Sequence, residues 1–250
     1  MRKLVILIFL VFIFFKSGIT QTADTYFQQG ISELSQGNVE KAIENFTKGI
    51  ELRPNEPGAY TNRGIAYLKL KNYEKATNDF NKAIELNPED IKAYYYRGLS
   101  FSQQEKYDEA INSFTKAIEI EPSYYNAYNE RGLVYYYQQK DSLAITDFTK
   151  AIENNAEFVD AYNNRGYVYY LNNQLDKALA DFNKVIELDP GNARAYYNRG
   201  FTYYKQKLFS EALIDFNKAL EINSKFKDKL TPYIDEINKI LNPPKEETKQ

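Results

Sequence analysis

The side chains of this 250-residue sequence that could do chemistry are carboxylates, basic groups, phenols, hydroxyls and amides, because it contains no His, Cys or Trp. Without imidazole and thiol groups, a Ser-His-Asp or Cys-His nucleophile, a Cys/His zinc site and a disulfide framework are all excluded. A pair of carboxylates, as in glycoside hydrolysis, is the remaining catalytic option. Glu130 is the single candidate for such an acid.

Other acids recur in a pattern that suits a solvated surface better than an active site. A Lys lies three residues before a Glu in six places, and these places are spaced 34 residues apart. The pairs are Lys48 with Glu51, Lys82 with Glu85, Lys116 with Glu119, Lys150 with Glu153, Lys184 with Glu187, and Lys218 with Glu221. Such residues meet on an exposed helix face. No glycine-rich phosphate loop accompanies them, so we predict a non-enzymatic protein with no catalytic residue, metal or cofactor.

The elements that carry these residues repeat every 34 residues. A Gly, an Ala and a Phe each recur at this interval. The three series are Gly30, Gly64, Gly98, Gly132, Gly166 and Gly200; Ala42, Ala76, Ala110, Ala144, Ala178 and Ala212; and Phe46, Phe80, Phe114, Phe148, Phe182 and Phe216. With the Gly at the eighth position, the units are 23–56, 57–90, 91–124, 125–158, 159–192 and 193–226. An unbroken period of this length indicates a repeat architecture.

Each unit has the pattern of two α-helices. In the second unit, Tyr60, Gly64 and Tyr67 follow one another at helical spacing, and a second apolar series runs from Tyr73 to Phe80 and beyond. A proline, which cannot continue a helix, follows the second helix in four units. These prolines are Pro54, Pro88, Pro122 and Pro190. Units four and six lack it, so we expect their ends to be less sharply fixed.

Side-chain volume explains the pattern. Small residues at positions 8 and 20 let the two helices approach closely, while Phe at position 24 and Tyr at positions 4 and 11 fill the core. No unit buries its apolar face alone, so the last unit needs a cover. Residues 227–242 repeat apolar side chains at helical steps and are predicted to form a capping helix. Residues 243–250 are polar and expected to be disordered.

The spacing and residue types resemble those of the tetratricopeptide repeat family. Its 34-residue helix-turn-helix carries an aromatic residue at position 4, Gly at 8, Tyr at 11, Ala at 20, Phe at 24, Ala at 27 and Pro at 32. The second unit matches all seven, with Tyr60, Gly64, Tyr67, Ala76, Phe80, Ala83 and Pro88. The resemblance implies an all-α, right-handed α-solenoid superhelix that serves as a scaffold for binding other proteins.

The resemblance also implies where a partner binds. In such arrays the first helix of each unit lines a concave groove, and an Asn at position 6 resembles the asparagine ladder that holds extended peptide backbone. Asn62, Asn164 and Asn198 occupy that position, while other residue types interrupt it in units one, three and four. Amides and aromatic rings on the same helix face complete the predicted peptide-binding set. Its members are Asn62, Tyr95, Asn129, Tyr136, Asn163, Asn164, Tyr167, Tyr170, Tyr197, Asn198, Phe201 and Tyr204.

Two alternatives apply to this set. Rings at positions 9 and 12 could instead seal the contacts between adjacent first helices. A carbohydrate or envelope polymer could also bind the same tyrosines and asparagines. With a formal net charge of −2, the chain is a poor candidate for binding nucleic acid, so we expect a protein or an extended peptide as the partner.

A further recurrence places Arg at position 7 and Asp at position 23 of the same unit. It occurs in units two, four, five and six, whereas unit three has Arg97 opposite Ser113. We predict an ion pair between the two helices of each of these four units. The pairs are Arg63 with Asp79, Arg131 with Asp147, Arg165 with Asp181, and Arg199 with Asp215.

The first twenty residues do not follow the repeat. Arg2 and Lys3 precede an apolar run of 12 residues, 4–15, and small or polar residues follow it. This pattern is typical of an export signal, and the run is shorter than the about 20 apolar residues that span a membrane. We predict a signal peptide over residues 1–20 and export to a bacterial periplasm or cell envelope, with no permanent membrane span. An uncleaved N-terminal anchor is the alternative.

Overall fold

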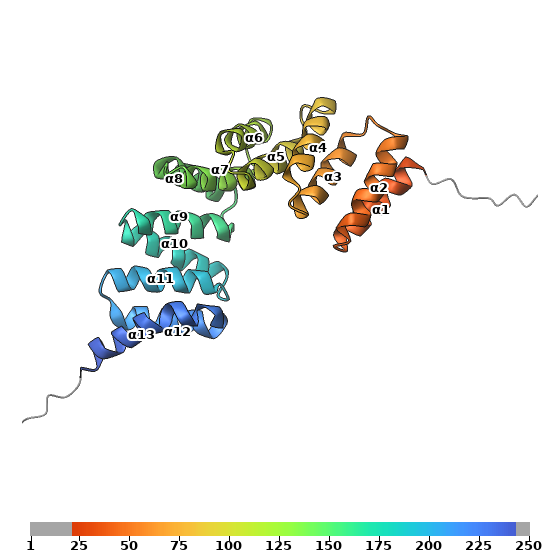
Figure 1. Ribbon diagram of the computed structural model, residues 1–250. Helices are drawn as coiled ribbons and strands as arrows, with labels where there is room; N and C mark the ends of the chain where they lie inside the picture. Colours follow the sequence, from red (N-terminus) through yellow and green to blue (C-terminus); the bar gives the residue numbers. More distant parts are fainter. Residues whose placement is uncertain (1–21, 244–250) are drawn as a thin grey trace, which may run out of the picture.

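The computed structural model describes residues 22–243, which form six consecutive pairs of α-helices, one turn of 3-10 helix and a last α-helix (Figure 1). The paired helices are α1 (Ala23–Ser35) and α2 (Val39–Leu52), α3 (Pro57–Lys69) and α4 (Tyr73–Leu86), α5 (Ile91–Gln103) and α6 (Tyr107–Ile120), α7 (Tyr125–Tyr137) and α8 (Asp141–Asn154), α9 (Val159–Leu171) and α10 (Leu175–Leu188), and α11 (Ala193–Lys205) and α12 (Phe209–Ile222). The turn η1 (Ser224–Phe226) and the helix α13 (Lys227–Leu241) follow. No strand occurs within residues 22–243, and the predicted all-α fold is confirmed. The predicted signal peptide, and the predicted tail beyond residue 243, lie outside the described residues.

The turn between the two helices has the same geometry in all six units. Its residue at position 15 is left-handed, with φ of 82° at Gly37 and φ of 58–64° at five other residues. Those five are Lys71, Glu105, Gln139, Asn173 and Lys207. In the second unit, the N–H groups of Lys71 and Asn72 then donate to the carbonyls of Leu68 and Tyr67. These bonds satisfy carbonyl groups that the end of a helix otherwise leaves free.

The second helices end alike whether or not a proline follows. The N–H of the residue after the helix donates to the carbonyl four residues back, from Asn87 to Ala83 in unit two and from Asn155 to Ala151 in unit four. Units four and six, which lack the proline, thus end their second helices with the same hydrogen bond as the other units, and in unit six the 3-10 turn η1 follows. The hydrogen bond does not depend on a proline.

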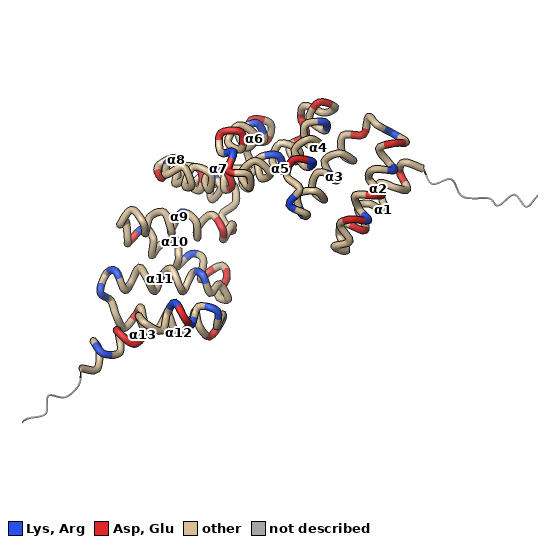
Figure 2. The backbone as a smooth tube through the Cα atoms, viewed as in Figure 1, with Lys and Arg blue, Asp and Glu red and all other residues tan. Residues whose placement is uncertain are grey.

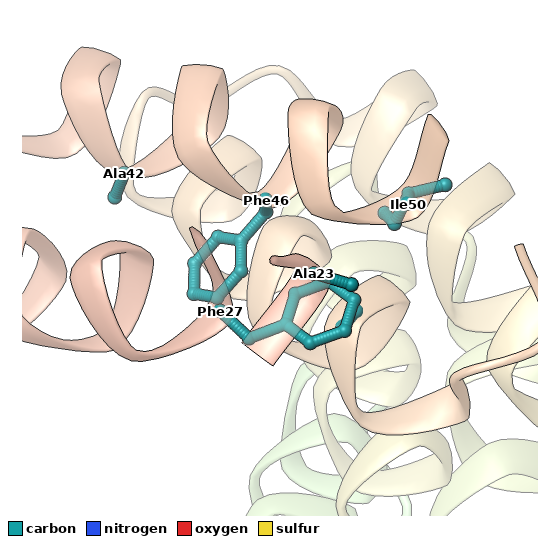
Figure 3. Packing of buried hydrophobic residues seen from close by; sticks show 6 residues of the cluster. Ala23, Phe27, Ala42, Phe46 and Ile50 are labelled. Carbon is teal, nitrogen blue, oxygen red and sulfur yellow. The ribbon is translucent and has the colours of Figure 1, made fainter. Parts of the chain in front are cut away.

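A phenylalanine at position 24 fills the space between the two helices of each unit. All six of these side chains are fully buried, as are the alanines at position 20. The ring lies directly over the Gly of its own unit: a Cβ on Gly64 would lie 2.6 Å from the ring of Phe80. Figure 3 shows the first unit, where Phe46 lies between α1 and α2 with Phe27 beside it. The glycines are needed because a phenylalanine ring occupies the place of their side chain.

The first helices lie on the inner side of the curved array. Each second helix contacts the first helix of the next unit, and neighbouring first helices also contact one another. Second helices of neighbouring units make no such contact within residues 22–243. A stack whose elements touch on one side and separate on the other must curve toward the touching side, and Figure 1 shows this bent path. At the C-terminal end, α13 contacts α12 and buries Leu230 and Ile237.

The four predicted Arg–Asp pairs are confirmed, and each is bidentate. Their N–O distances are 2.7–2.9 Å, and the Asp side chains are 2–8% exposed. A further guanidinium N–H donates to the preceding unit, as Arg165 does to Thr149 at 3.0 Å. The tyrosines at positions 4 and 11, predicted as core, are half-buried and flank the cation; Tyr162 and Tyr169 lie 5.7 and 5.9 Å from Arg165. Each Arg therefore joins two helices and two units.

Exposed charges are mixed in sign along the molecule (Figure 2). The predicted Lys–Glu pairs form in units two to six. In unit one, Lys48 pairs with Glu44 instead of Glu51.

Among the helices between residues 22 and 243, none has the length and apolar character needed to cross a membrane.

Candidate functional site

Three hollows open along the first helices, and an Asn at position 6 lines each of them. The Asn62 hollow, about 250 Å³, lies between α1 and α3. The Asn164 hollow, about 220 Å³, lies between α7, α9 and α11. The Asn198 hollow, about 240 Å³, lies between α9, α11 and α13. The amides of the predicted ladder therefore lie where a ligand crossing the first helices would meet them.

Unit three separates the Asn62 hollow from the other two. The ring of Tyr95 contacts those of Tyr96, Tyr124 and Phe114, with centroid distances of 5.2, 5.3 and 5.9 Å. Burial, followed by the charge of Glu130, raises the pKa of Tyr95 far above its ordinary value, and burial raises the pKa of Tyr124 to about 12. Tyr95, predicted as a groove residue, is thus committed to an aromatic cluster within the array.

Two amides that we predicted to face the groove are buried. Asn129 is 3% exposed and Asn163 is 2% exposed. Both occupy position 5 of their unit, and Asn129 is bonded to the next unit. Its Oδ1 accepts a hydrogen bond from Nδ2 of Asn164 in the next unit, at 3.0 Å. Asn129 therefore serves the contact between units, whereas Oδ1 of Asn163 has no hydrogen-bond partner within residues 22–243. Neither amide lines one of the three hollows, and the prediction that these two amides face a ligand is corrected accordingly.

Asn164 belongs to a chain of hydrogen bonds that crosses units four, five and six. Its Oδ1 accepts from Nη2 of Arg194 at 3.2 Å, and Asn129 in turn donates from Nδ2 to Oε1 of Glu130 at 3.1 Å. Burial raises the pKa of Glu130, although the hydrogen bond from Asn129 opposes this shift and the charge of Asp160 adds to it. The chain therefore ends in a carboxylate that is poorly solvated and in an exposed guanidinium.

Unlike the amide of Asn164, the amide of Asn198 has a donor that is not hydrogen-bonded within the described residues. The residue is 9% exposed, and its Nδ2 has no hydrogen-bond partner within residues 22–243. A buried polar group without a partner costs about 1–3 kcal/mol. Asn198 lines its hollow, so its amide is a polar group that a ligand there could satisfy.

Aromatic rings form walls of the Asn164 and Asn198 hollows. Tyr136 and Tyr167 lie along the first, where their ring centroids are 6.0 Å apart. The rings that line the second are Tyr167, Tyr170, Tyr197, Phe201 and Tyr233. The rings of Tyr167 and Tyr170 are stacked, with centroids 6.5 Å apart. The structure thus brings most of the predicted aromatic set together on α7, α9 and α11.

Comparison with known proteins decides the family. Sequence models described as TPR repeat and as tetratricopeptide repeat both match the chain. The first matches residues 23–71, 132–173 and 168–207, and the second matches residues 57–90, 91–124 and 193–226. The chain belongs to the tetratricopeptide repeat family. No curated protein matches the sequence.

Solved structures with the same fold resemble this tetratricopeptide repeat protein. YrrB, described as a TPR protein with an unusual peptide-binding site, is 30% identical, with a TM-score of 0.61 over 75% of this chain and 96% of YrrB. MamA is 27% identical, with a TM-score of 0.60 over 66% of this chain and 96% of MamA. A tetratricopeptide repeat protein from Parabacteroides merdae is 24% identical, with a TM-score of 0.63 over 86% of this chain and 84% of that one, and shows the fold alone.

One residue that lines the Asn198 hollow was not among the binding residues predicted from the sequence. Tyr233 belongs to α13, outside the period, yet it lines the Asn198 hollow. Its ring centroid lies 4.8 Å from that of Phe201 and 5.3 Å from that of Tyr204. Tyr204, which we predicted as a binding residue, contacts this ring but is not among the residues that line the hollow. The apolar series of the capping helix marks Tyr233 as inward-facing, but not as reaching α11.

Proposed function

We propose that this tetratricopeptide repeat protein is a non-enzymatic interaction module that binds an extended peptide segment of a partner protein on its concave side. The proposal rests on one observation: the amides at position 6 of units two, five and six line hollows on that side. A side-chain amide offers a donor and an acceptor to a peptide group of any sequence. YrrB, which is 30% identical and has a peptide-binding site, supports the same use of the surface here.

The amides differ in how well they suit an experiment. Asn164 is bonded to Asn129 and Arg194. Its removal would leave Oδ1 of the buried Asn129 unpaired, so a loss of binding could not be told apart from a loss of stability. Asn198 has a free Nδ2, so its replacement by Ala removes a contact to the ligand without breaking one within the protein. Asn198→Ala is therefore the sharper test of binding.

The experiment selects peptides from a random display library on the purified protein and measures their affinity by fluorescence anisotropy. We expect Asn198→Ala to weaken the selected peptides about fivefold, as the loss of one hydrogen bond does. Asn112→Ala, which removes an exposed amide on α6 away from the three hollows, is the matched control. If neither Asn62→Ala nor Asn198→Ala changes any affinity, while circular dichroism shows both folded, the concave side is not the binding site.

We further propose that the module works outside the cytoplasm after export. The support is the sequence of residues 1–20, in which two basic residues precede an apolar run of 12 residues. The test is to produce the full-length chain in a bacterial host and to measure the intact mass of the protein in each cell fraction by mass spectrometry. Export predicts a periplasmic protein that begins near residue 21. Full-length protein in the membrane fraction would indicate an uncleaved anchor, and recovery in the cytoplasm alone would contradict export.

A further inference from the structure

We propose that the Asn164 and Asn198 hollows form one continuous site for a proline-containing segment in the polyproline II conformation. This inference rests on the proposed peptide-binding function and names the chemistry of the peptide. It follows from the lining of the Asn198 hollow, from the spacing of the two hollows and from the free amide of Asn198.

The lining of the Asn198 hollow is aromatic and uncharged. It consists of Tyr167, Tyr170, Tyr197, Asn198, Phe201 and Tyr233. A charged side chain entering this hollow would lose hydration without meeting an opposite charge in the lining. Aromatic-lined grooves are the surfaces that take up proline-rich segments, because the proline rings lie against the aromatic faces and the polyproline II helix is already ordered. The lining therefore fits a neutral segment with ring-shaped side chains.

The two hollows are consecutive along the array. Tyr167 is a wall of both, and its ring lies between those of Tyr136 and Tyr170, at centroid distances of 6.0 and 6.5 Å. The Asn164 hollow is lined mainly by α7 and α9, and the Asn198 hollow mainly by α9 and α11, so the second is displaced from the first by one first helix. Helices that lie side by side are about 8–10 Å apart. Three residues of a polyproline II helix advance about 9 Å. A proline in one hollow therefore places a proline three residues away in the next.

The free amide of Asn198 supplies the polar contact that such a segment needs. Carbonyl groups of a polyproline II helix form no hydrogen bonds within the helix and remain available to donors. Asn198 is 9% exposed, and its Nδ2 has no partner within residues 22–243. Its amide can donate to a carbonyl next to the proline. A donor suits the site better than an acceptor, because the proline nitrogen carries no hydrogen.

Fluorescence anisotropy with defined peptides tests this assignment on the purified protein. The probes are fluorescein-labelled decaproline, a labelled Gly-Ser peptide of equal length, and three Gly-Ser peptides that carry two prolines spaced two, three or four residues apart. We expect decaproline to bind at least about tenfold more tightly than the Gly-Ser peptide. Among the spaced peptides, a separation of three residues should bind best, because it matches the spacing of the hollows.

Variants then locate the binding. Tyr233→Ala and Asn198→Ala should each weaken decaproline about fivefold or more. Their matched controls are Tyr73→Ala on α4 and Asn112→Ala on α6, which are distant from the hollows and should leave the affinity within twofold. Circular dichroism melts identify a variant that has lost its fold, and Tyr233→Phe, which keeps the ring, should then retain binding.

The outcomes separate this inference from the proposed function. If decaproline binds no better than the Gly-Ser peptide, or if Tyr233→Ala and Asn198→Ala leave its affinity unchanged, the inference is overturned. Library-selected peptides without proline that still depend on Asn198 would keep the peptide-binding function and discard the proline site. Binding of cellohexaose that is lost in Tyr233→Ala, with no peptide binding, would assign the hollows to carbohydrate and overturn both.

Discussion

Arg97 is the one arginine of the repeated series that lacks an acid at position 23. Its Nε donates to Oγ of Ser113 at 3.1 Å, where the other units offer a carboxylate. Burial lowers the pKa of Arg97, which is the result expected for a cation without an opposing charge. We expect Ser113→Asp to supply the missing partner and to raise the free energy of unfolding by about 1–2 kcal/mol, as measured by urea denaturation.

The reverse change tests the same interaction from a complete pair. Asp181→Ala should lower the free energy of unfolding by about 3 kcal/mol, because it leaves Arg165 half-buried and unpaired. A double-mutant cycle with Arg165→Ala should show strong coupling between the two residues. Additive effects in this cycle, together with an unchanged stability of Ser113→Asp, would mean that the pairs do not stabilise the contact between the two helices of a unit.

Glu130 should make the stability depend on pH. Burial raises its pKa above the ordinary value of 4.5, and Asp160 adds to the shift. A carboxyl with a higher pKa in the folded chain binds its proton more tightly when folded, so stability falls as the pH rises from 4.5 through the folded pKa. We expect Glu130→Gln to be more stable than the parent at pH 7 and to lose that advantage near pH 4, as measured by urea denaturation at both values.

A matched acid on the surface shows whether burial is the cause. Glu153 lies on α8 and pairs with Lys150 in an exposed contact. Glu153→Gln should change stability little at either pH, because exposed pairs contribute little. Equal behaviour of the Glu130 and Glu153 variants would contradict a special role for the buried carboxyl.

Among the elements, the turns within the units hold strain that glycine would relieve. Position 15 is left-handed in every unit, but only unit one has a glycine there. We expect Glu105→Gly and Lys207→Gly each to raise the free energy of unfolding by about 0.5–1 kcal/mol. The left-handed conformation costs residues other than glycine about 1–2 kcal/mol. Part of this gain is offset because glycine gives the unfolded chain a higher conformational entropy. Asn173→Gly should gain less, because Asn tolerates this conformation. Thermal melts of the three variants check this order, and a loss of stability in all of them would contradict it.

The sequence predicts the elements better than their lateral contacts. The period of 34 residues and the small-residue series place the helices, because each unit repeats the same local spacing. The burial of Asn129 could not be predicted, since its partner Asn164 comes from the next unit, and the equivalent side chains one unit further on, Asn163 and Asn198, do not form the same hydrogen bond. The role of Tyr233 could not be predicted either, because α13 has no repeat to set its register against α11. A repeat pattern predicts only contacts that recur, so it cannot predict a contact that occurs once.

At the scale of the whole molecule, the concave side is unequally divided. The aromatic cluster around Tyr95 separates the Asn62 hollow from the two hollows of units four to six. The Asn164 and Asn198 hollows share Tyr167 as a lining residue, and Tyr233 of α13 lines the Asn198 hollow. The last helix thus covers the core of unit six and also forms a wall of the proposed site, so the stability of this end bears directly on binding.

A repeat array is held together through contacts between neighbours, so damage at one end should stay near that end. Leu230 of α13 is fully buried, whereas Ile240 on the same helix is 45% exposed. Leu230→Ala should cost about 2–5 kcal/mol in the stability of the C-terminal end, and Ile240→Ala should cost less than about 0.5 kcal/mol. Native-state hydrogen exchange should show lower protection in α11 to α13 of Leu230→Ala and unchanged protection in α1 to α4. A uniform loss of protection along the chain would instead show that the six units unfold as one cooperative body, and α13 would then stabilise the whole array rather than its last unit.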